Sequence, residues 1–233
     1  RSSTVQFIEL VTAFALVLLT VGLSAQQPQR SQPPPTAQAR PATDLTGTWV
    51  SVVTEDWRFR MVTPEKGDYA SVPLNPEGRK VADTWDPARD VAQGNQCRPF
   101  GVGNIMRMPG RMRISWQDPN TLKIDYDAGQ QTRLLHFDKS LRPAAEKAWQ
   151  GWSVAEWEFA RGEGNGSLKV VTTNMRAGYL RKNGVPYSEG MVLTEFFDRH
   201  TLPNGDEWFT VTTVADDARY LTQPFTTSTH FKK

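Results

Sequence analysis

Glu195 is the acidic side chain whose position in the sequence best suits chemistry inside the protein. If the segment around it is a strand, Glu195 shares a face with Met191, Leu193 and Phe197 and points inward. A buried carboxylate requires a cationic partner, because an unpaired charge is costly away from water. We therefore predict an inward ion pair of structural character rather than a catalytic acid. The arginines that could supply the partner are Arg58, Arg60, Arg107 and Arg133.

Glu156 and Glu158 flank Trp157, so on a strand both carboxylates would project from the same face. Two acids about 6–7 Å apart would suit an acid/base pair for glycoside hydrolysis. The alternative is an exposed polar face, because Ala155, Trp157 and Phe159 would form the apolar face opposite. This second interpretation is the one we predict.

The other residue types that carry chemistry form no recognisable site in the sequence. The histidines His136, His200 and His230 lack the spacing of metal ligands. The sequence contains no Gly-x-Ser-x-Gly nucleophile elbow. We therefore predict no catalytic residue, no metal site and no cofactor, and we favour a protein without enzymatic activity.

The composition narrows the class of protein further. The 233 residues carry 27 basic and 25 acidic side chains without a long basic run, which argues against a nucleic-acid partner. Cys97 is the single cysteine, so an internal disulfide is excluded and packing must stabilise the folded part. Eight tryptophans can fill a core or line an apolar cavity.

Alternation of apolar and polar residues is the main structural signal after Asp44. Met112, Ile114 and Trp116 alternate with polar residues, as is typical of a strand that covers a core on one side. The same pattern predicts strands at 48–53, 57–62, 112–116, 122–126, 133–137, 153–159, 168–175, 191–198, 208–214 and 226–231.

Short turns such as Asn183-Gly184 and Asn204-Gly205 separate many of these strands and favour an antiparallel meander. A meander of this length is expected to close into a β-barrel, because closure removes unpaired edges. Asn75 and Pro76 predict the start of one short helix. We expect a long loop at 86–103 and one helical turn at 144–147.

An apolar run at residues 10–25 precedes a proline-rich strip at 26–43. The run suits a signal peptide cleaved after Ala25. Extended back to Val5 it also suits a transmembrane helix of about 19 residues, with Glu9 at its edge. The predicted organisation is a hydrophobic signal or anchor helix at 1–25, a linker at 26–43 and a barrel domain at 44–233.

The opening of the folded part, Asp44-Leu45-Thr46-Gly47-Thr48-Trp49, resembles the Gly-x-Trp start of lipocalins and their calycin relatives. The resemblance implies a lipocalin-like barrel whose cup holds an apolar ligand. It also implies that Trp49 closes the barrel floor beneath a late arginine, Arg199 or Arg219. Stretches at 178–188, 193–199 and 220–225 resemble uncharacterised exported bacterial proteins and imply no activity.

These observations lead first to an interaction role. We expect a non-catalytic accessory or scaffold subunit on the periplasmic side of a bacterial inner membrane, anchored in the lipid bilayer. Its partners would be subunits of a larger membrane complex, for example respiratory or photosynthetic, which contact residues 1–43.

Two alternatives stay open. The first is a secreted carrier, released by cleavage of residues 1–25, that binds a small apolar ligand. The second is a lipocalin-like hydratase, cyclase or hydrolase that uses an inward acid. The residues predicted to contact a ligand are Trp49, Trp57, Trp116, Trp157, Trp208 and Glu195.

Overall fold

The computed structural model describes residues 34–160 and 166–233. The predicted hydrophobic helix at 1–25 and the first part of the linker lie outside the described residues. Within the described ranges, no helix combines the length and the apolar character that crossing a bilayer requires. Residues 35–233 form one compact unit.

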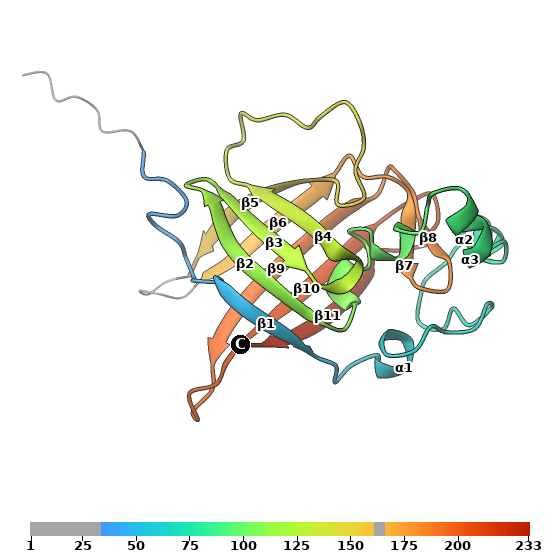
Figure 1. Ribbon diagram of the computed structural model, residues 1–233, viewed down its shortest axis with the longest axis horizontal. Helices are drawn as coiled ribbons and strands as arrows, with labels where there is room; N and C mark the ends of the chain where they lie inside the picture. Colours follow the sequence, from blue (N-terminus) through green and yellow to red (C-terminus); the bar gives the residue numbers. More distant parts are fainter. Residues whose placement is uncertain (1–33, 161–165) are drawn as a thin grey trace, which may run out of the picture. The chain divides into compact units, whose positions relative to one another are not determined.

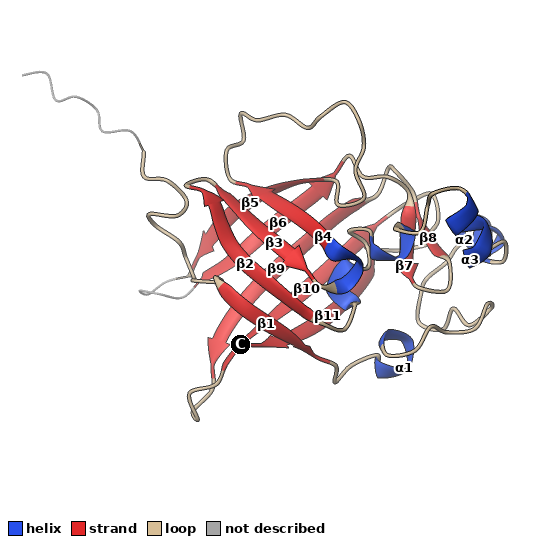
Figure 2. Ribbon diagram, viewed as in Figure 1, coloured by secondary structure: helices blue, strands red, loops and turns tan. Residues whose placement is uncertain are grey.

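Nine strands of the described chain close into a barrel in the order β1-β11-β10-β9-β6-β5-β4-β3-β2 (Figures 1 and 2). This confirms the prediction of a mainly β barrel. The barrel strands are β1 (Gly47–Val52), β2 (Arg111–Asp118), β3 (Thr121–Tyr126), β4 (Gln131–His136), β5 (Trp152–Phe159), β6 (Gly166–Thr173), β9 (Val192–Thr201), β10 (Glu207–Asp216) and β11 (Phe225–Lys232).

The prediction of a purely antiparallel meander is wrong at one position. β4 and β5 pair in parallel, with Leu135 opposite Ser153, whereas the other paired barrel strands of the described chain are antiparallel. Parallel neighbours need a connection that returns along the strands, and residues 137–151 make that return. These residues contain bends and a bridge at Ala148, so the helical turn expected at 144–147 does not form.

Side-chain alternation places the barrel interior where the sequence predicted it. On β10, Phe209, Val211, Thr213 and Ala215 are buried, while the residues between them are partly exposed. The same period of two follows from the pleat of every strand. A single inward row of this kind from each strand supplies the side chains of the barrel interior.

One end of the barrel, the aromatic end, is closed by rings. Trp49 packs edge-on against Phe209, with ring centroids 4.7 Å apart, and Phe209 stacks on Phe231 at 4.8 Å. The indole Nε1 of Trp49 donates to the carbonyl oxygen of Leu45 at 2.8 Å. The Gly-x-Trp segment therefore closes this end, as its resemblance implied.

The cation over the Trp49 ring is a lysine, not the arginine that the resemblance implied. Nζ of Lys233 lies 5.5 Å from the ring centroid. Arg199 and Arg219 instead form ion pairs with glutamates.

Residues 35–40 of the predicted linker lie against the same end of the barrel. The indole Nε1 of Trp157 donates to the carbonyl oxygen of Ala37 at 3.1 Å, and the amide of Gln38 donates to the oxygen of Pro119 at 3.0 Å. Trp157 also packs on Phe137, with centroids 5.1 Å apart.

The opposite end is covered by a cap, which we define as residues 55–107 together with the hairpin of β7 (Gly178–Arg181) and β8 (Val185–Tyr187) (Figure 1). The helices of the cap are α1 (Trp57–Arg60), α2 (Pro76–Ala82), α3 (Pro87–Ala92) and the 3₁₀ turns η1 (Arg98–Phe100) and η2 (Ile105–Arg107). A further 3₁₀ turn, η3 (Ala128–Gln130), joins β3 to β4.

Local sequence explains how the cap helices begin. The side chain of Asn75 accepts a hydrogen bond from the amide of Gly78 at 2.8 Å, which confirms the predicted start of α2. The loop predicted at 86–103 is wrong in part, because Asp86 caps α3 by accepting from the amides of Ala88 and Arg89. Pro87 at the first position of α3 is compatible with this start.

The strand predicted at 57–62 is also wrong, since this segment forms α1. Asp56 adopts φ 49° and ψ 26°, a left-handed conformation that ends the extended run from β1. The amide of Phe59 then bonds to the carbonyl oxygen of Asp56 at 2.8 Å. The alternation of apolar and basic residues at 57–62 does not make this segment a strand. Arg60 donates to the carbonyl oxygen of Arg107, and tertiary contacts of this kind override local strand propensity.

Candidate functional site

Glu195 points into the barrel from β9 and pairs with Arg133 of β4, which confirms the predicted inward ion pair. Nη2 of Arg133 lies 2.5 Å from Oε2 of Glu195, and the two side chains are 1% and 0% exposed. Arg133 also donates to the hydroxyls of Ser153 at 3.0 Å and Thr172 at 2.7 Å. Ser153 and Thr172 are themselves 2.9 Å apart.

The surroundings of Arg133 keep its guanidinium charged. Burial opposes the charge on Arg133, but the charges and hydrogen bonds of Glu195 and Tyr126 together outweigh burial, so the pKa of the guanidinium is raised. Burial also raises the pKa of Tyr126, whose hydroxyl donates to Sδ of Met106 at 3.2 Å. A carboxylate held by a buried guanidinium and shielded from solvent is suited to a structural role.

The other predicted ligand contacts are distributed over the molecule. Trp49, Trp116 and Trp157 lie at the aromatic end, where Trp116 and Trp157 both pack on Phe137. Trp57 lies on α1 with 64% of its surface exposed, and Trp208 lies on the outer side of β10. The structure therefore does not gather the five tryptophans into one cup, and their role in ligand binding stays a prediction.

The paired glutamates on β5 lie on the outer face, as predicted. Glu156 forms ion pairs with Lys139 at 2.7 Å and Lys169 at 3.5 Å, and Glu158 lies 3.9 Å from Lys169. The hydrogen bond from Lys139 is the main reason that the pKa of Glu156 is lowered. Both carboxylates are solvated and each faces a lysine, as an exposed polar face requires.

The histidines occupy separate environments. His136 stacks on Trp152 with centroids 4.0 Å apart, and burial lowers its pKa. His230 contacts Thr210 at 3.0 Å and Glu55 at 3.7 Å. Over the ranges 34–160 and 166–233, no three His, Cys, Asp or Glu side chains gather in a way that would hold a metal ion.

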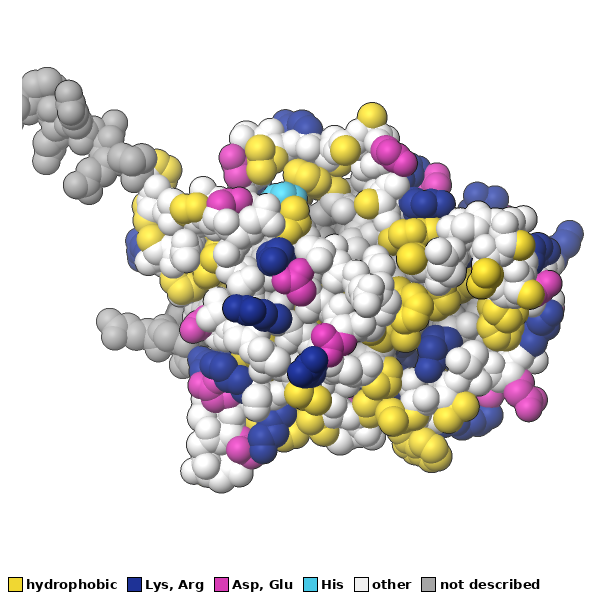
Figure 3. Space-filling view, in the orientation of Figure 1, with side chains coloured by type: hydrophobic (Ala, Val, Ile, Leu, Met, Phe, Trp, Pro, Cys, Tyr) yellow, Lys and Arg dark blue, Asp and Glu magenta, His cyan; other side chains and the backbone are white. Residues whose placement is uncertain are grey.

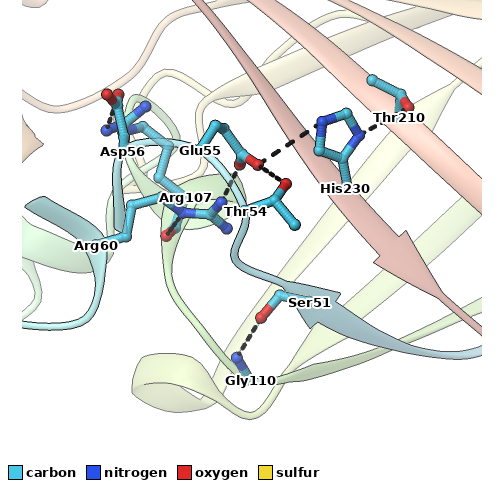
Figure 4. A network of polar contacts seen from close by, with 9 residues as sticks. All are labelled: Ser51, Thr54, Glu55, Asp56, Arg60, Arg107, Gly110, Thr210 and His230. Carbon is cyan, nitrogen blue, oxygen red and sulfur yellow. Dashed lines mark hydrogen bonds and ion pairs between the residues drawn. The ribbon is translucent and has the colours of Figure 1, made fainter. Parts of the chain in front are cut away.

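The cap holds a second polar cluster, the cap arginines, which we define as Arg60, Arg107 and Arg181. Their exposed fractions are 1%, 4% and 1%. Arg60 pairs with Glu55, and its Nε donates to the carbonyl oxygen of Arg107 at 2.9 Å. Nη2 of Arg107 donates to Asp56 at 2.9 Å. Figure 4 shows Arg60 and Arg107 side by side, with Glu55 between Arg60 and His230 of β11.

Arg181 lies at the end of β7 and is stabilised by aromatic rings. Its guanidinium carbon lies 3.9 Å from the ring centroid of Phe59 and 5.9 Å from that of Phe225. Nη1 donates to the carbonyl oxygen of Ala70 at 2.5 Å. Among the described residues, no carboxylate lies within 4 Å of this guanidinium.

Mutual repulsion and burial act together on these side chains. Burial lowers the pKa of Arg181 to about 10, and the positive charge of Arg107 adds to the effect. Burial likewise lowers the pKa of Arg60, although Glu55 opposes it. With a pKa of about 10, Arg181 is still protonated at neutral pH, so the cap carries a buried positive charge.

A groove of about 360 Å³ lies beside the cap arginines, between α3, η1 and the β7–β8 turn. We name it the cap groove. Lys182 lines it, and the ammonium donates to the carbonyl oxygen of Arg60 at 2.9 Å while burial lowers its pKa. The lining residues are Thr63, Trp85, Pro87, Asp90, Val91, Gln96, Pro99, Phe100 and Lys182.

Asp90 in the wall of the groove is already satisfied. It accepts from the hydroxyl of Tyr179 at 2.5 Å and from Arg98 at 2.8 Å. The lining is therefore mainly apolar, with Lys182 as its cationic group.

Sequence reasoning missed the cap as a site. The sequence offers Arg60 and Arg107 as partners for Glu195 and Arg107 also as part of a basic hairpin, whereas Arg181 and Lys182 enter only within the stretch 178–188. The signal that could have found two of them is an apolar residue on each side of the arginine, Phe59 and Met61 around Arg60 and Met106 and Met108 around Arg107. Long basic side chains inside such spacing need a partner when they are buried.

Comparison with family models, with curated proteins and with solved structures finds no match to this chain, so the geometry carries the functional argument.

Proposed function

We propose that this chain is a non-enzymatic binding protein, with a lipocalin-like barrel domain on the periplasmic side of the membrane. Its ligand is a small molecule with an apolar body and an anionic group, held in the cap groove. The observation that carries the proposal is the groove itself, about 360 Å³ in volume, with apolar walls and the ammonium of Lys182. Pockets for small ligands share this size and this combination of apolar walls with a few polar groups.

The groove supports this role better than the barrel interior does. Trp49, Phe197 and Phe209 are each fully buried inside the barrel and contact one another through Phe209. The interior between the ends also holds the Arg133–Glu195 pair. The carrier role, which the sequence offers as an alternative, is therefore proposed for the cap groove and not for the barrel interior.

The fluorescent probe 1-anilinonaphthalene-8-sulfonate tests the proposal, because it combines an aromatic body with an anionic sulfonate. Val91 lines the groove and is 64% exposed, so Val91→Glu adds a negative charge there without disturbing a core. We expect probe binding to weaken about tenfold, since like charges repel in a partly desolvated site.

Val192→Glu is the matched control, because Val192 is exposed on β9 outside the groove. Laurate should displace the probe from the unchanged protein and from the control. Equal probe affinity in all three proteins would overturn the proposal.

A second candidate role, as an accessory subunit anchored beside membrane proteins, is favoured by α1. Trp57, Met61 and Val62 are 64%, 57% and 64% exposed and follow closely in the chain. Figure 3 shows hydrophobic side chains gathered at the lower right edge, where Figure 1 places α1. Contiguous exposed apolar residues mark interaction surfaces, whereas single ones need no explanation.

The test of this second role is the intact mass of the protein isolated from native membranes, together with the proteins that co-purify. The triple variant Trp57→Ser, Met61→Ser, Val62→Ser should lose those partners and keep its fold. Recovery of a monomer without residues 1–25 and without partners would contradict the accessory role.

A further inference from the structure

The cap arginines carry more hydrogen-bond donors than the described residues satisfy. Nη2 of Arg60, Nη1 of Arg107, and both Nε and Nη2 of Arg181 are buried and have no acceptor within the described parts of the chain. A buried charged donor without a partner is strongly destabilising. Four such donors in one cluster suit an acceptor that comes from outside the described parts of the chain.

The cluster also contains more positive than negative charge. Glu55 pairs with Arg60 and Asp56 pairs with Arg107, while Asp68 is engaged by the exposed Arg58. Arg181 is left with the face of an aromatic ring and one carbonyl oxygen. A ring face stabilises the cation but accepts no in-plane N–H bond.

The unsatisfied donors of Arg181 have a specific geometry. Nε and Nη2 lie on the same edge of the guanidinium plane and form the fork that binds the two oxygens of a carboxylate or phosphate. Both are among the buried unpartnered atoms. The guanidinium carbons of Arg107 and Arg181 lie 5.8 Å and 5.9 Å from the ring centroid of Phe225, so Nη1 of Arg107 adds a further buried unpartnered donor to the same cluster.

We propose that the cap arginines bind an oxyanion, either a carboxylate or a phosphate group, through the free edge of Arg181 together with Nη1 of Arg107. The bound anion supplies the missing negative charge and the missing acceptors. Because these donor atoms are buried, entry of the anion requires a local movement of the cap. This inference rests on the arginines and does not depend on a ligand in the cap groove.

The experiment measures the thermal unfolding midpoint in millimolar inorganic phosphate, in acetate and in chloride at equal ionic strength. An anion that binds the folded state raises the midpoint in proportion to its saturation. We expect a rise of several degrees in phosphate or acetate for the unchanged protein and none for Arg181→Gln. Arg111→Gln removes an exposed arginine that pairs with Asp127, and it should keep the full rise.

The two anions distinguish the source of the oxyanion. A rise with phosphate alone identifies a phosphate group, and a rise with acetate alone identifies a carboxylate, and either result supports the site. No rise with either anion, or an equal rise in Arg181→Gln, overturns it.

Two further measurements guard against trivial results. If Arg181→Gln does not fold, Arg181→Lys keeps the charge without the fork, and anion binding measured by titration calorimetry should weaken about tenfold or more. Val91→Glu should keep the response to phosphate, which separates failure of this inference from failure of the groove proposal.

Discussion

At the aromatic end of the barrel, Trp49, Phe209 and Phe231 make ring contacts, and the ammonium of Lys233 lies over the Trp49 ring. At the cap end, Arg60, Arg107 and Arg181 lie buried among short ion pairs and aromatic faces. Side chains are buried at both ends, but the aromatic end buries apolar rings whereas the cap end buries charged guanidinium groups.

This difference separates stability from function within one domain. Burying rings is favourable and needs no partner outside the chain. Burying guanidinium groups is costly, and an apolar replacement of similar volume is often as stable. Three buried arginines at one end therefore carry an energetic cost that a bound anion would offset, which supports the proposal of an anion site in the cap.

The largest effect should come from removing a ring at the aromatic end. Trp49→Ala deletes a fully buried indole and should lower the free energy of unfolding by about 4 kcal/mol. Trp57→Ala, on exposed α1, should change it by less than about 0.5 kcal/mol. Chemical denaturation of both variants measures the contrast, and equal losses would show that the aromatic end does not carry the core.

Breaking the interior ion pair should lower the free energy of unfolding less than Trp49→Ala does, and a second substitution should restore it. Glu195→Leu leaves Arg133 buried without its carboxylate and should destabilise the protein by about 3 kcal/mol. Adding Arg133→Met removes the stranded charge and should restore the stability to within about 1 kcal/mol of the unchanged protein. A double variant as unstable as the single one would mean that the pair contributes more than its charges.

The smallest effect concerns pH at the aromatic end. The hydrogen bond from Lys233, aided by Arg199, holds the pKa of Glu207 below its ordinary value of 4.5. Its contribution to stability is therefore complete above about pH 4.5 and is lost as the pH falls through the folded-state pKa.

Glu207→Gln should remove that part of the pH dependence and flatten the stability curve below pH 4.5. The difference should stay under about 1 kcal/mol, because a partly exposed ion pair contributes little. Denaturation midpoints measured between pH 3 and 7, in steps of about one unit, would show it. Parallel curves for the two proteins would contradict the assignment.

Much of the barrel could be predicted because its strands are half buried. Alternation identified the inward face of β9, and with it Glu195, since a pleated strand exposes every second residue to the core. The same reasoning supplied Arg133 among four candidate partners. The pattern could not identify which of the four arginines pairs with Glu195, because the pairing depends on which elements become neighbours in the fold.

The cap could not be predicted in the same way. Residues 57–62 alternate like a strand, yet the left-handed conformation of Asp56 turns them into α1. Arg60 then becomes buried rather than exposed, held by a carbonyl oxygen of η2 that is distant in the sequence. Irregular segments take their conformation from tertiary contacts, so neither their elements nor their buried charges follow from local periodicity.

The barrel is completed by pairing β1 with β11, so that Val50 lies opposite Lys232 at the far end of the chain order. Contacts between such distant segments carry a large loop-closure entropy and are associated with slow folding. The barrel therefore cannot close during synthesis until β11 has emerged from the ribosome. A cyclised barrel domain, with a short linker between the adjacent residues Gly47 and Lys233, would make this pairing local without opening another hairpin and should refold faster.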